Sequence, residues 1–569
     1  MPDFKTKESL RVAIAQVNCI VGDLDGNAAK IKEYALQADK AGADVVCFPE
    51  LALTGYPPED LLIKPKFIAD NLLKLRELAK GIGSIVAVVG FVDRQNKEIF
   101  NSAAVIYKGR VRGIYRKIYL PNYSVFDEKR YFSPGVEPMI FSAACPKNRK
   151  FTFGVNICED IWHFDGPLKT QSSCGAGLII NINSSPYYVG KIKQRKEIVC
   201  RQAKKNKVVV IYANLVGGQD ELVFDGQSMI VDELGKILAM ARAFKEELLI
   251  ADIKVPVPAI KSRKYLSVIS KKAPVKKKNS LPIKNILPLE ETAEVYQALT
   301  LGLKDYVVKN GFRKTVIGFS GGIDSALVAA IATDALGRDN VVGVFMPSRY
   351  SSSESLADSQ KLASNLGVEL LCISIEELYE LYLKVLRPHF AGLGANIAEE
   401  NLQARIRGNI IMALSNKFSW LVLTTGNKSE MSTGYATLYG DMAGGFAVIK
   451  DVPKTLVYKL AKYRNSLEPV IPERIIIREP TAELKPNQKD SDTLPVYEKL
   501  DPILKAYIEE DKDLNKIISL GFDKDTVLRV RDMVDKSEYK RRQSPPGIKI
   551  TPKAFGRDRR MPITNKYRS

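Results

Sequence analysis

The sequence predicts two α/β domains joined by a basic linker. Its 569 residues exceed what a single hydrophobic core usually organises, so at least two domains are expected. Both halves alternate strand-like apolar runs with amphipathic helical stretches, whereas the Lys- and Pro-rich residues 254–288 between them show no periodicity. We therefore expect domains over residues 1–253 and 289–569, with 254–288 as the linker.

The first half shows seven strand-like apolar runs and an amphipathic stretch at residues 27–42. The runs cover residues 10–17, 44–50, 84–92, 102–109, 151–159, 177–184 and 208–215. Glu50 ends one of these runs and Cys158 ends another. Because α/β sheets place their ligands at the carboxyl ends of strands, both are candidate site residues.

The second half continues the alternation with more regular spacing. Expected helices cover residues 291–311, 325–337 and 354–367, and expected strands cover residues 314–320, 341–347 and 369–375. No internal repeat is visible. Two unrelated α/β patterns in one chain suggest two different chemistries.

Composition excludes several classes of protein. The net charge of +20 is compatible with phosphate binding, but much of the excess lies in residues 261–284 and 539–560, a linker and a terminal segment, so we expect no nucleic-acid partner. Seven cysteines at irregular spacing, without CxxC or a leading signal peptide, favour reduced thiols. No apolar run approaches the roughly 20 residues that span a bilayer. We expect a cytoplasmic protein with no membrane partner.

A glycine-rich turn stands between an expected strand and an expected helix in the second half. Its glycines let the backbone approach a phosphate, its serines offer hydroxyls, and Asp324 offers a carboxylate to Mg²⁺. The GK[ST] signature of γ-phosphate transfer is absent. An isolated Gly-Gly could also be a plain helix start. The residues expected to bind phosphate here, and ATP by the resemblance described next, are Gly318, Phe319, Ser320, Gly321, Gly322, Ile323, Asp324 and Ser325.

The SGGxDS turn resembles the pyrophosphate loop of the ATP-pyrophosphatase superfamily, which implies a Rossmann-like, doubly wound parallel sheet. It also implies that ATP adenylates a carbonyl oxygen and that a nitrogen nucleophile then displaces AMP. Residues 401–416, 423–455, 478–492 and 538–560 resemble the NAD synthetase signature. The resemblance therefore implies ATP and deamido-NAD as substrates, Mg²⁺, and NAD as the product.

Carried over by position, the resemblance assigns further residues of this half. Thr425 and Lys454 would contact ATP, and Glu430 would bind Mg²⁺ or the dinucleotide; Asn401, Arg405 and Lys540 would contact deamido-NAD. Leu438 stands where the ammonia-using family members commonly have lysine, a departure that matches the longer members. By residue type alone, Glu430 and Lys540 could be surface charges, Asn401 a helix cap and Arg405 an exposed helical arginine.

Cys158 lies in VNICEDIW, directly before Glu159 and Asp160, whose charges disfavour a thiolate. Cysteine-based amide hydrolysis needs a base, a nucleophile and a cationic group. With only two histidines in the chain, a carboxylate can be the base and a lysine the cation. Glu50 at a strand end and Lys117 in RKIYLPNY fit these roles, although each could equally be a structural or surface residue.

The stretches at 48–62, 116–132 and 155–162 resemble, in their order and separation, the motifs of the nitrilase superfamily, which implies an α-β-β-α sandwich. By that resemblance Glu50 is the general base, Lys117 the electrostatic and proton-transfer partner, and Cys158 the nucleophile that forms a thioester. Glu128 would orient this triad. The glutamine contacts would fall on Tyr123, Ser185 and Lys191.

Together the two halves resemble the NAD synthetases that draw ammonia from glutamine, over nearly the full chain. The resemblance implies a homo-oligomer, and since ammonium is not nucleophilic we also expect a protected passage for ammonia. Two alternatives stay open on the sequence. The second half could modify tRNA, or the first half could be a stand-alone amidase attached to a nucleotide-sensing domain.

Overall fold

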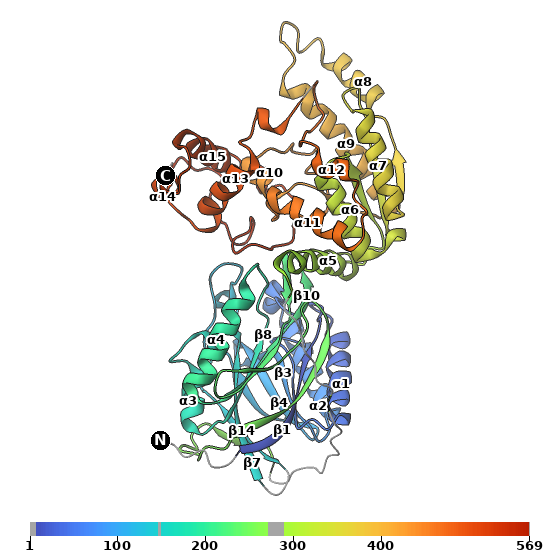
Figure 1. Ribbon diagram of the computed structural model, residues 1–569. Coiled ribbons are helices and arrows are strands. Elements are labelled where there is room, and N and C mark those ends of the chain that lie inside the picture. Colours follow the sequence, from blue (N-terminus) through green and yellow to red (C-terminus); the bar gives the residue numbers. More distant parts are fainter. Residues whose placement is uncertain (1–6, 146–148, 271–280, 282–288, 487, 568–569) are drawn as a thin grey trace. The chain divides into compact units, whose positions relative to one another are not determined.

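The computed structural model describes residues 7–145, 149–270, 281, 289–486 and 488–567. The chain divides into two compact units (Figure 1). One comprises Met1–Gln219 and Val223–Leu289, and the other comprises Glu290–Ser569 with Asp220–Leu222. Within the described residues no helix is both long and apolar enough to cross a membrane.

The first unit is built on two β-sheets that pack face to face. Their strand orders are β14-β1-β2-β3-β4-β5 and β13-β12-β9-β8-β7-β6-β15. In each sheet the central strands are parallel, and the pairs toward the edges are antiparallel except for β6 with β15, which is parallel. The strands are β1 (Lys7–Gln16), β2 (Val45–Cys47), β3 (Val86–Gln95), β4 (Glu98–Tyr107), β5 (Arg110–Arg116), β6 (Ile140–Cys145), β7 (Arg149–Ile157), β8 (Leu178–Asn183), β9 (Val209–Asn214), β12 (Met229–Val231), β13 (Ile237–Met240), β14 (Glu247–Pro256) and β15 (Leu266–Val268), with a separate hairpin of β10 (Val216–Gln219) and β11 (Leu222–Asp225).

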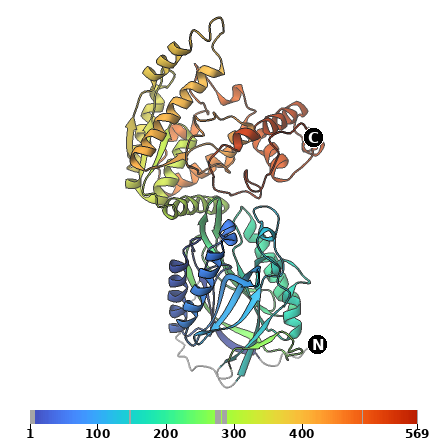
Figure 2. The ribbon, with the colours of Figure 1, turned by 180° about the vertical axis from the view of Figure 1, so that it is seen from behind.

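Helices cover the outer face of each sheet (Figures 1 and 2). Helices α1 (Leu24–Lys40) and α2 (Pro65–Lys80) pack on the first sheet, and α3 (Pro167–Cys174) and α4 (Lys191–Asn206) on the second. The main core, with Ile14, Val88, Phe153 and Ile180, fills the space between the sheets. Alternating apolar strands with amphipathic helices thus form the expected α-β-β-α sandwich.

The segment expected to be a linker begins with ordered structure. Residues 254–256 complete β14, and β15 pairs in parallel with β6 at the edge of the second sheet. This short strand was not predicted, because it lies among lysines in the segment expected to be a linker. An edge strand tolerates such charged neighbours. Residues 271–280 and 282–288 of the expected linker lie outside the described residues.

The second unit contains a five-stranded parallel sheet in the order β18-β17-β16-β19-β20. The strand order reverses at β16, which is the doubly wound arrangement predicted from the sequence. The strands are β16 (Thr315–Phe319), β17 (Val341–Phe345), β18 (Glu369–Cys372), β19 (Leu421–Thr424) and β20 (Phe446–Ala447).

Helices surround this sheet, and a smaller helical cluster follows it. The helices are α5 (Glu291–Lys309), α6 (Ile323–Leu336), α7 (Ser353–Leu366), α8 (Glu376–Leu386), α9 (Ile397–Phe418), α10 (Lys428–Thr433), α11 (Lys454–Leu467), α12 (Glu473–Ile477), α13 (Tyr497–Leu504), α14 (Leu514–Ser519), α15 (Lys524–Lys536) and α16 (Glu538–Arg541). Helices α5, α6 and α11 pack together, while α8 packs on α9, which also contacts β16 and β19.

Candidate active sites

The three predicted triad residues of the first unit each follow a strand. Glu50 lies three residues beyond β2, Lys117 directly follows β5, and Cys158 directly follows β7. All three side chains are buried. By residue type alone Lys117 could have been a surface residue, but the structure buries it between the carboxylates of Glu50 and Glu128.

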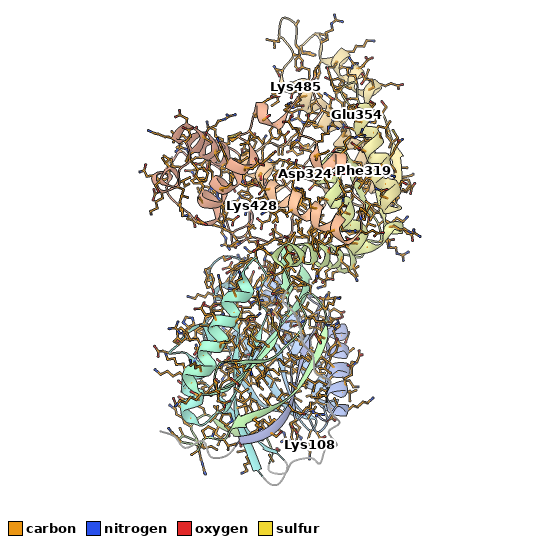
Figure 3. All side chains as sticks on the ribbon, in the orientation of Figure 1. Lys108, Phe319, Asp324, Glu354, Lys428 and Lys485 are labelled. Atoms are coloured by element: carbon orange, nitrogen blue, oxygen red, sulfur yellow. The ribbon has the colours of Figure 1, made fainter. Side chains whose placement is uncertain are left out.

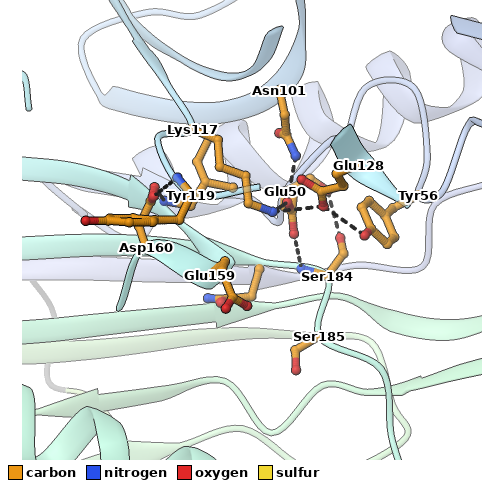
Figure 4. Close-up of polar contacts among 12 residues, drawn as sticks. Glu50, Tyr56, Asn101, Lys117, Tyr119, Glu128, Glu159, Asp160, Ser184 and Ser185 are labelled. Atoms are coloured by element: carbon orange, nitrogen blue, oxygen red, sulfur yellow. Dashed lines mark hydrogen bonds and ion pairs between the residues drawn. The ribbon is translucent and has the colours of Figure 1, made fainter. Parts of the chain in front are cut away.

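Glu50 is held by donors from three different segments. Its Oε1 accepts from Lys117 Nζ at 2.7 Å and from Asn101 Nδ2 at 2.7 Å. Its Oε2 accepts from the Ser184 backbone N–H at 2.8 Å. Figure 4 shows these groups converging. Asn101 and Ser184 were not predicted, because nothing in the local sequence indicates which side chain meets a distant carboxylate.

Glu128 joins the same network from a short 3₁₀ turn, Glu128–Arg130. Its Oε1 accepts from Lys117 Nζ at 2.9 Å and from the Tyr56 hydroxyl at 3.0 Å. Burial raises the pKa of Glu128 to about 7; Lys117 opposes this shift and Glu50 adds to it. Burial lowers the pKa of Lys117, but the two carboxylates outweigh it and the net shift is upward. Lys117 therefore stays charged between them.

Cys158 opens a second 3₁₀ turn, Cys158–Trp162, with a left-handed φ of 42°. For a residue with a side chain this backbone costs about 1–2 kcal/mol, and such strain is typical of functional turns. Burial raises the pKa of its thiol well above the usual value, Glu50 adds to this, and Lys117 opposes it. The resting thiol is therefore protonated and needs a base.

The residues predicted to contact glutamine lie on segments around Cys158. The Tyr123 hydroxyl donates to Glu159 at 2.9 Å. The Ser185 hydroxyl accepts from Arg195 Nε at 3.2 Å. Lys191 is the first residue of α4, with Nζ 4.4 Å from the ring centre of Trp162. Burial lowers the pKa of Lys191 to about 8.

The glycine turn of the second unit lies where the strand order reverses, between β16 and α6 (Phe319 and Asp324 in Figure 3). Gly321 has a φ of 74°, and a Cβ there would come within 2.8 Å of Ser355 Cα. Glycine is thus required by conformation and by space. Two cavities of about 140 and 270 Å³ border the turn, and the larger is lined by residues including Gly318, Phe319 and Thr425.

Lys454, the first residue of α11, links two carboxylates beside this turn. Its Nζ contacts Asp324 Oδ2 and lies 3.5 Å from Glu430 Oε1. Burial raises the pKa of Glu430 to about 8, the negative charge of Asp324 adds to this, and Lys454 opposes it. Two carboxylates that share one cation offer hard oxygen ligands for a second cation.

Asn427 was not predicted, although a local signal exists. It is the N-cap of α10, where its Oδ1 accepts from the Glu430 N–H at 3.0 Å and its Nδ2 donates to Asp324 at 3.0 Å. Asn427 and Glu430 form a capping box, the pattern that the letters N-K-S-E indicate. Glu430 is therefore fixed in the first turn of a helix, and is not a loose surface acid.

The three residues predicted to contact deamido-NAD converge on residues 434–438. Asn401 Oδ1 accepts from Thr437 at 2.7 Å, Arg405 Nε donates to the Leu438 carbonyl at 3.2 Å, and Lys540 Nζ donates to the Gly434 and Ala436 carbonyls at 2.7 and 2.8 Å. Asn401 is not a helix cap, because Asn396 caps α9.

Residues of the segment 478–492 also border the smaller cavity, Arg478 and Glu483 among them. Arg478 donates to Glu483 at 2.7 Å and to the Ser355 hydroxyl at 2.8 Å. Among the described residues, no cluster of three or more His, Cys, Asp or Glu side chains could hold a metal ion. Asp324 and Glu430, which share Lys454, form a pair of carboxylates beside the turn.

Comparisons with known proteins match each half of the chain to a family. Residues 11–258 match the carbon–nitrogen hydrolase family and residues 295–544 match the NAD synthase family. The glutamine-dependent NAD(+) synthetase of Thermotoga maritima is 49% identical, with 98% of this chain and 99% of that protein covered. The corresponding protein of Acinetobacter baylyi is 46% identical, with 99% of each chain covered.

Solved structures extend the likeness to the fold. A glutamine-dependent NAD+ synthetase from Acinetobacter baumannii, solved in complex with ADP, is 44% identical with a TM-score of 0.75, covering 98% of this chain and 99% of that one. A glutamine-dependent NAD(+) synthetase from Cytophaga hutchinsonii has a TM-score of 0.81 at 22% identity, with 98% of each chain covered, and shows the fold alone. On these full-length matches, the chain belongs to the family of glutamine-dependent NAD(+) synthetases.

Proposed function

We propose that this protein converts deamido-NAD, ATP, glutamine and water into NAD, AMP, pyrophosphate and glutamate. The observation that carries the proposal is the buried Glu50–Lys117–Cys158 cluster in one unit together with the SGGxDS turn in the other. The first arrangement suits release of ammonia from an amide. The second suits activation of a carboxylate by ATP.

In the first unit, Glu50 accepts the thiol proton and Cys158 attacks the glutamine amide carbon. Lys117, held charged by Glu50 and Glu128, stabilises the negative charge on the tetrahedral oxygen. The proton passes to the departing nitrogen, which leaves as ammonia, and the acyl group remains on sulfur as a thioester. Water activated by Glu50 then releases glutamate. Tyr123, Ser185 and Lys191 would hold the substrate's amino-acid end.

In the second unit, the turn from Gly318 to Ser325 would bind ATP phosphates through backbone N–H groups at the start of α6. Thr425 borders the larger cavity, and Lys454 would neutralise phosphate charge. Asn401, Arg405 and Lys540 would contact deamido-NAD around residues 434–438. The nicotinate carboxylate attacks the α-phosphate and expels pyrophosphate, and ammonia then displaces AMP from the acyl adenylate.

The carboxylates of Asp324 and Glu430 fit Mg²⁺, with phosphate oxygens and water as the remaining ligands. The raised pKa of Glu430 supports this, because two adjacent buried carboxylates need added positive charge to stay ionised together. When bound, the metal would neutralise charge on the phosphates. The protein's own part is to hold the two carboxylates through Asn427 and Lys454.

Three further features belong to the proposal. Ammonia would travel through a protected passage, since ammonium in bulk water is not nucleophilic. Residues Leu378, Leu381, Tyr382 and Val385 form an exposed apolar stripe at helical spacing on α8, which supports a homo-oligomer. The catalytic need for a free Cys158 thiol supports a cytoplasmic location.

A product assay tests the proposal. Purified protein is incubated with deamido-NAD, ATP, Mg²⁺ and glutamine, and NAD, AMP, pyrophosphate and glutamate are quantified together. The proposal requires NAD and AMP in equal amounts. Glutamate formed without any NAD would instead support a stand-alone amidase.

The pKa of Glu128 predicts one feature of the pH profile. Ionised Glu128 adds negative charge near Glu50 and makes it a stronger proton acceptor, so kcat/KM for glutamine should increase as the pH rises through about 7. Glu128→Gln should lose this rise. Tyr56→Phe keeps the carboxylate but removes a hydrogen bond that lowers its pKa, so the rise should move to higher pH. An unchanged profile in Glu128→Gln would assign the titration to another group.

The pKa of Lys191 predicts the alkaline behaviour of glutamine binding. As the pH rises above about 8, Lys191 loses its charge and can no longer pair with the glutamine carboxylate, so KM for glutamine should increase. Below about pH 8 Lys191→Met should raise KM by about 10- to 100-fold, the value of one hydrogen bond to a charged group, and this difference from the wild type should shrink as the pH rises further. Lys191→Arg stays charged and should flatten the alkaline rise, which steady-state assays across pH would show. If the rise persists in Lys191→Arg, the assignment is wrong.

A further inference from the structure

Asp160, two residues after Cys158, is fully buried and accepts four hydrogen bonds. Its Oδ2 accepts from two donors and its Oδ1 from two others. Figure 4 shows Asp160 beside Tyr119. The donors are the Ile157 N–H at 2.9 Å, the Tyr115 hydroxyl at 2.8 Å, the Ile118 N–H at 3.2 Å and the Tyr119 N–H at 2.9 Å.

These donors belong to the two backbone segments that carry the nucleophile and the cation. Ile157 directly precedes Cys158, whereas Ile118 directly follows Lys117. The two segments leave different sheets, because β5 is the edge of the six-stranded sheet and β7 lies inside the seven-stranded one. No strand ladder joins them, so sheet pairing does not set the spacing of Cys158 and Lys117. Asp160 supplies a polar link between the two sheets at this point.

Burying a carboxylate between two segments costs folding free energy unless its oxygens accept hydrogen bonds. Here burial raises the pKa of Asp160 to about 6, and the Ile157 and Tyr119 N–H groups oppose that shift. The linked turn also contains the left-handed φ of Cys158, a conformation that persists only where its surroundings hold it. The four hydrogen bonds supply that restraint on both sides of the cluster.

We propose that Asp160 is a positioning residue that fixes the Cys158 turn against the Lys117 segment, and so sets the geometry of the thiol and the ammonium for glutamine hydrolysis. It acts through the backbone and does not contact the substrate. This inference rests on the proposed function of the first unit. It gives one of the two acids of CEDIW a role in the reaction.

The test compares Asp160→Asn with Tyr115→Phe. The asparagine keeps the shape of the side chain but places an NH₂ group against the Ile157 N–H or against the Ile118 and Tyr119 N–H groups, so one segment is released. Since a displacement of about 1 Å can cost about 10²-fold, kcat for glutamine hydrolysis should fall about 10²-fold with little change in KM. The rate at which iodoacetamide alkylates Cys158 should fall in parallel with kcat. Tyr115→Phe loses one bond but keeps all three backbone bonds, so kcat should change far less.

Two controls separate this inference from its basis. NAD formation from ammonium should be unchanged in both variants, and the unfolding transition of the first unit should be retained. Asp160→Glu, which keeps the charge but moves the carboxylate, should also lower kcat. The inference would be overturned if Asp160→Asn and Tyr115→Phe had equal effects on kcat, or if Asp160→Asn raised KM alone. Loss of the unfolding transition in both Asp160 variants would also overturn it. If wild-type protein and Cys158→Ala hydrolyse glutamine equally, the proposed function itself fails and the inference falls with it.

Discussion

Cys158→Ala should abolish NAD formation from glutamine while leaving NAD formation from ammonium intact. Glutamine-driven turnover should fall by at least about 10³-fold, because no other group of the cluster can form the thioester. Ammonium supplied at high concentration bypasses the first unit, since the second unit needs only ammonia. Both rates are measured by the appearance of NAD.

The matched control for this variant is Cys174→Ala. Cys174 is also a buried thiol of the same unit, but it packs at the end of α3 in the core cluster beneath the second sheet. Its replacement should leave both activities close to those of the wild type. Equal loss of the glutamine- and ammonium-driven reactions in Cys158→Ala would contradict the division of work between the two units.

Lys454→Met should stop adenylation with either nitrogen source. The variant leaves Asp324 and Glu430 side by side without their cation, and both are largely buried. Losing the partner of a buried ion pair costs about 3 kcal/mol or more, so the second unit should also become less stable. ATP–pyrophosphate exchange that depends on deamido-NAD measures the activity, and denaturant unfolding measures the stability.

Glu430→Gln separates the loss of adenylation from the loss of stability, which Lys454→Met is expected to cause together. It keeps the pair of Lys454 with Asp324, and glutamine can replace glutamate in the capping box of α10. Its stability should therefore stay near that of the wild type, while exchange should require more Mg²⁺. Normal exchange in Lys454→Met would refute the role of this residue in ATP binding.

Much of the fold follows from local patterns in the sequence. The apolar run at Val86–Val92 and the alanine-rich helix at Ile323–Leu336 are continuous apolar stretches bounded by turn residues, so their length and composition are enough to identify them. The scarcity of histidine narrowed the choice of catalytic partners for Cys158, because it left a carboxylate as the base and a lysine as the cation. Local patterns left RNA modification and a stand-alone amidase open as alternatives. Only the full-length matches favour a glutamine-dependent NAD(+) synthetase over both.

The supporting residues could not be found in the same way. Asn101 contacts Glu50, and Asp160 contacts Tyr115, across separations of 51 and 45 residues, and no local pattern encodes such pairs. The buried Lys117 likewise pairs with Glu50, which lies 67 residues away in the sequence. By contrast, the capping box at Asn427 was readable from four consecutive letters. Tertiary contacts that bring charges together therefore remain the part of the site that the sequence conceals.

The central claim is that the glutamine nitrogen released at Cys158 becomes the amide nitrogen of NAD. The most direct measurement uses glutamine labelled with ¹⁵N in its amide group, deamido-NAD and ATP, in the presence of excess unlabelled ammonium. Mass analysis of the NAD formed then compares its label with that of the free ammonia pool. We predict NAD labelled far above the free pool. NAD with the label content of the free pool, or with none, would contradict the account.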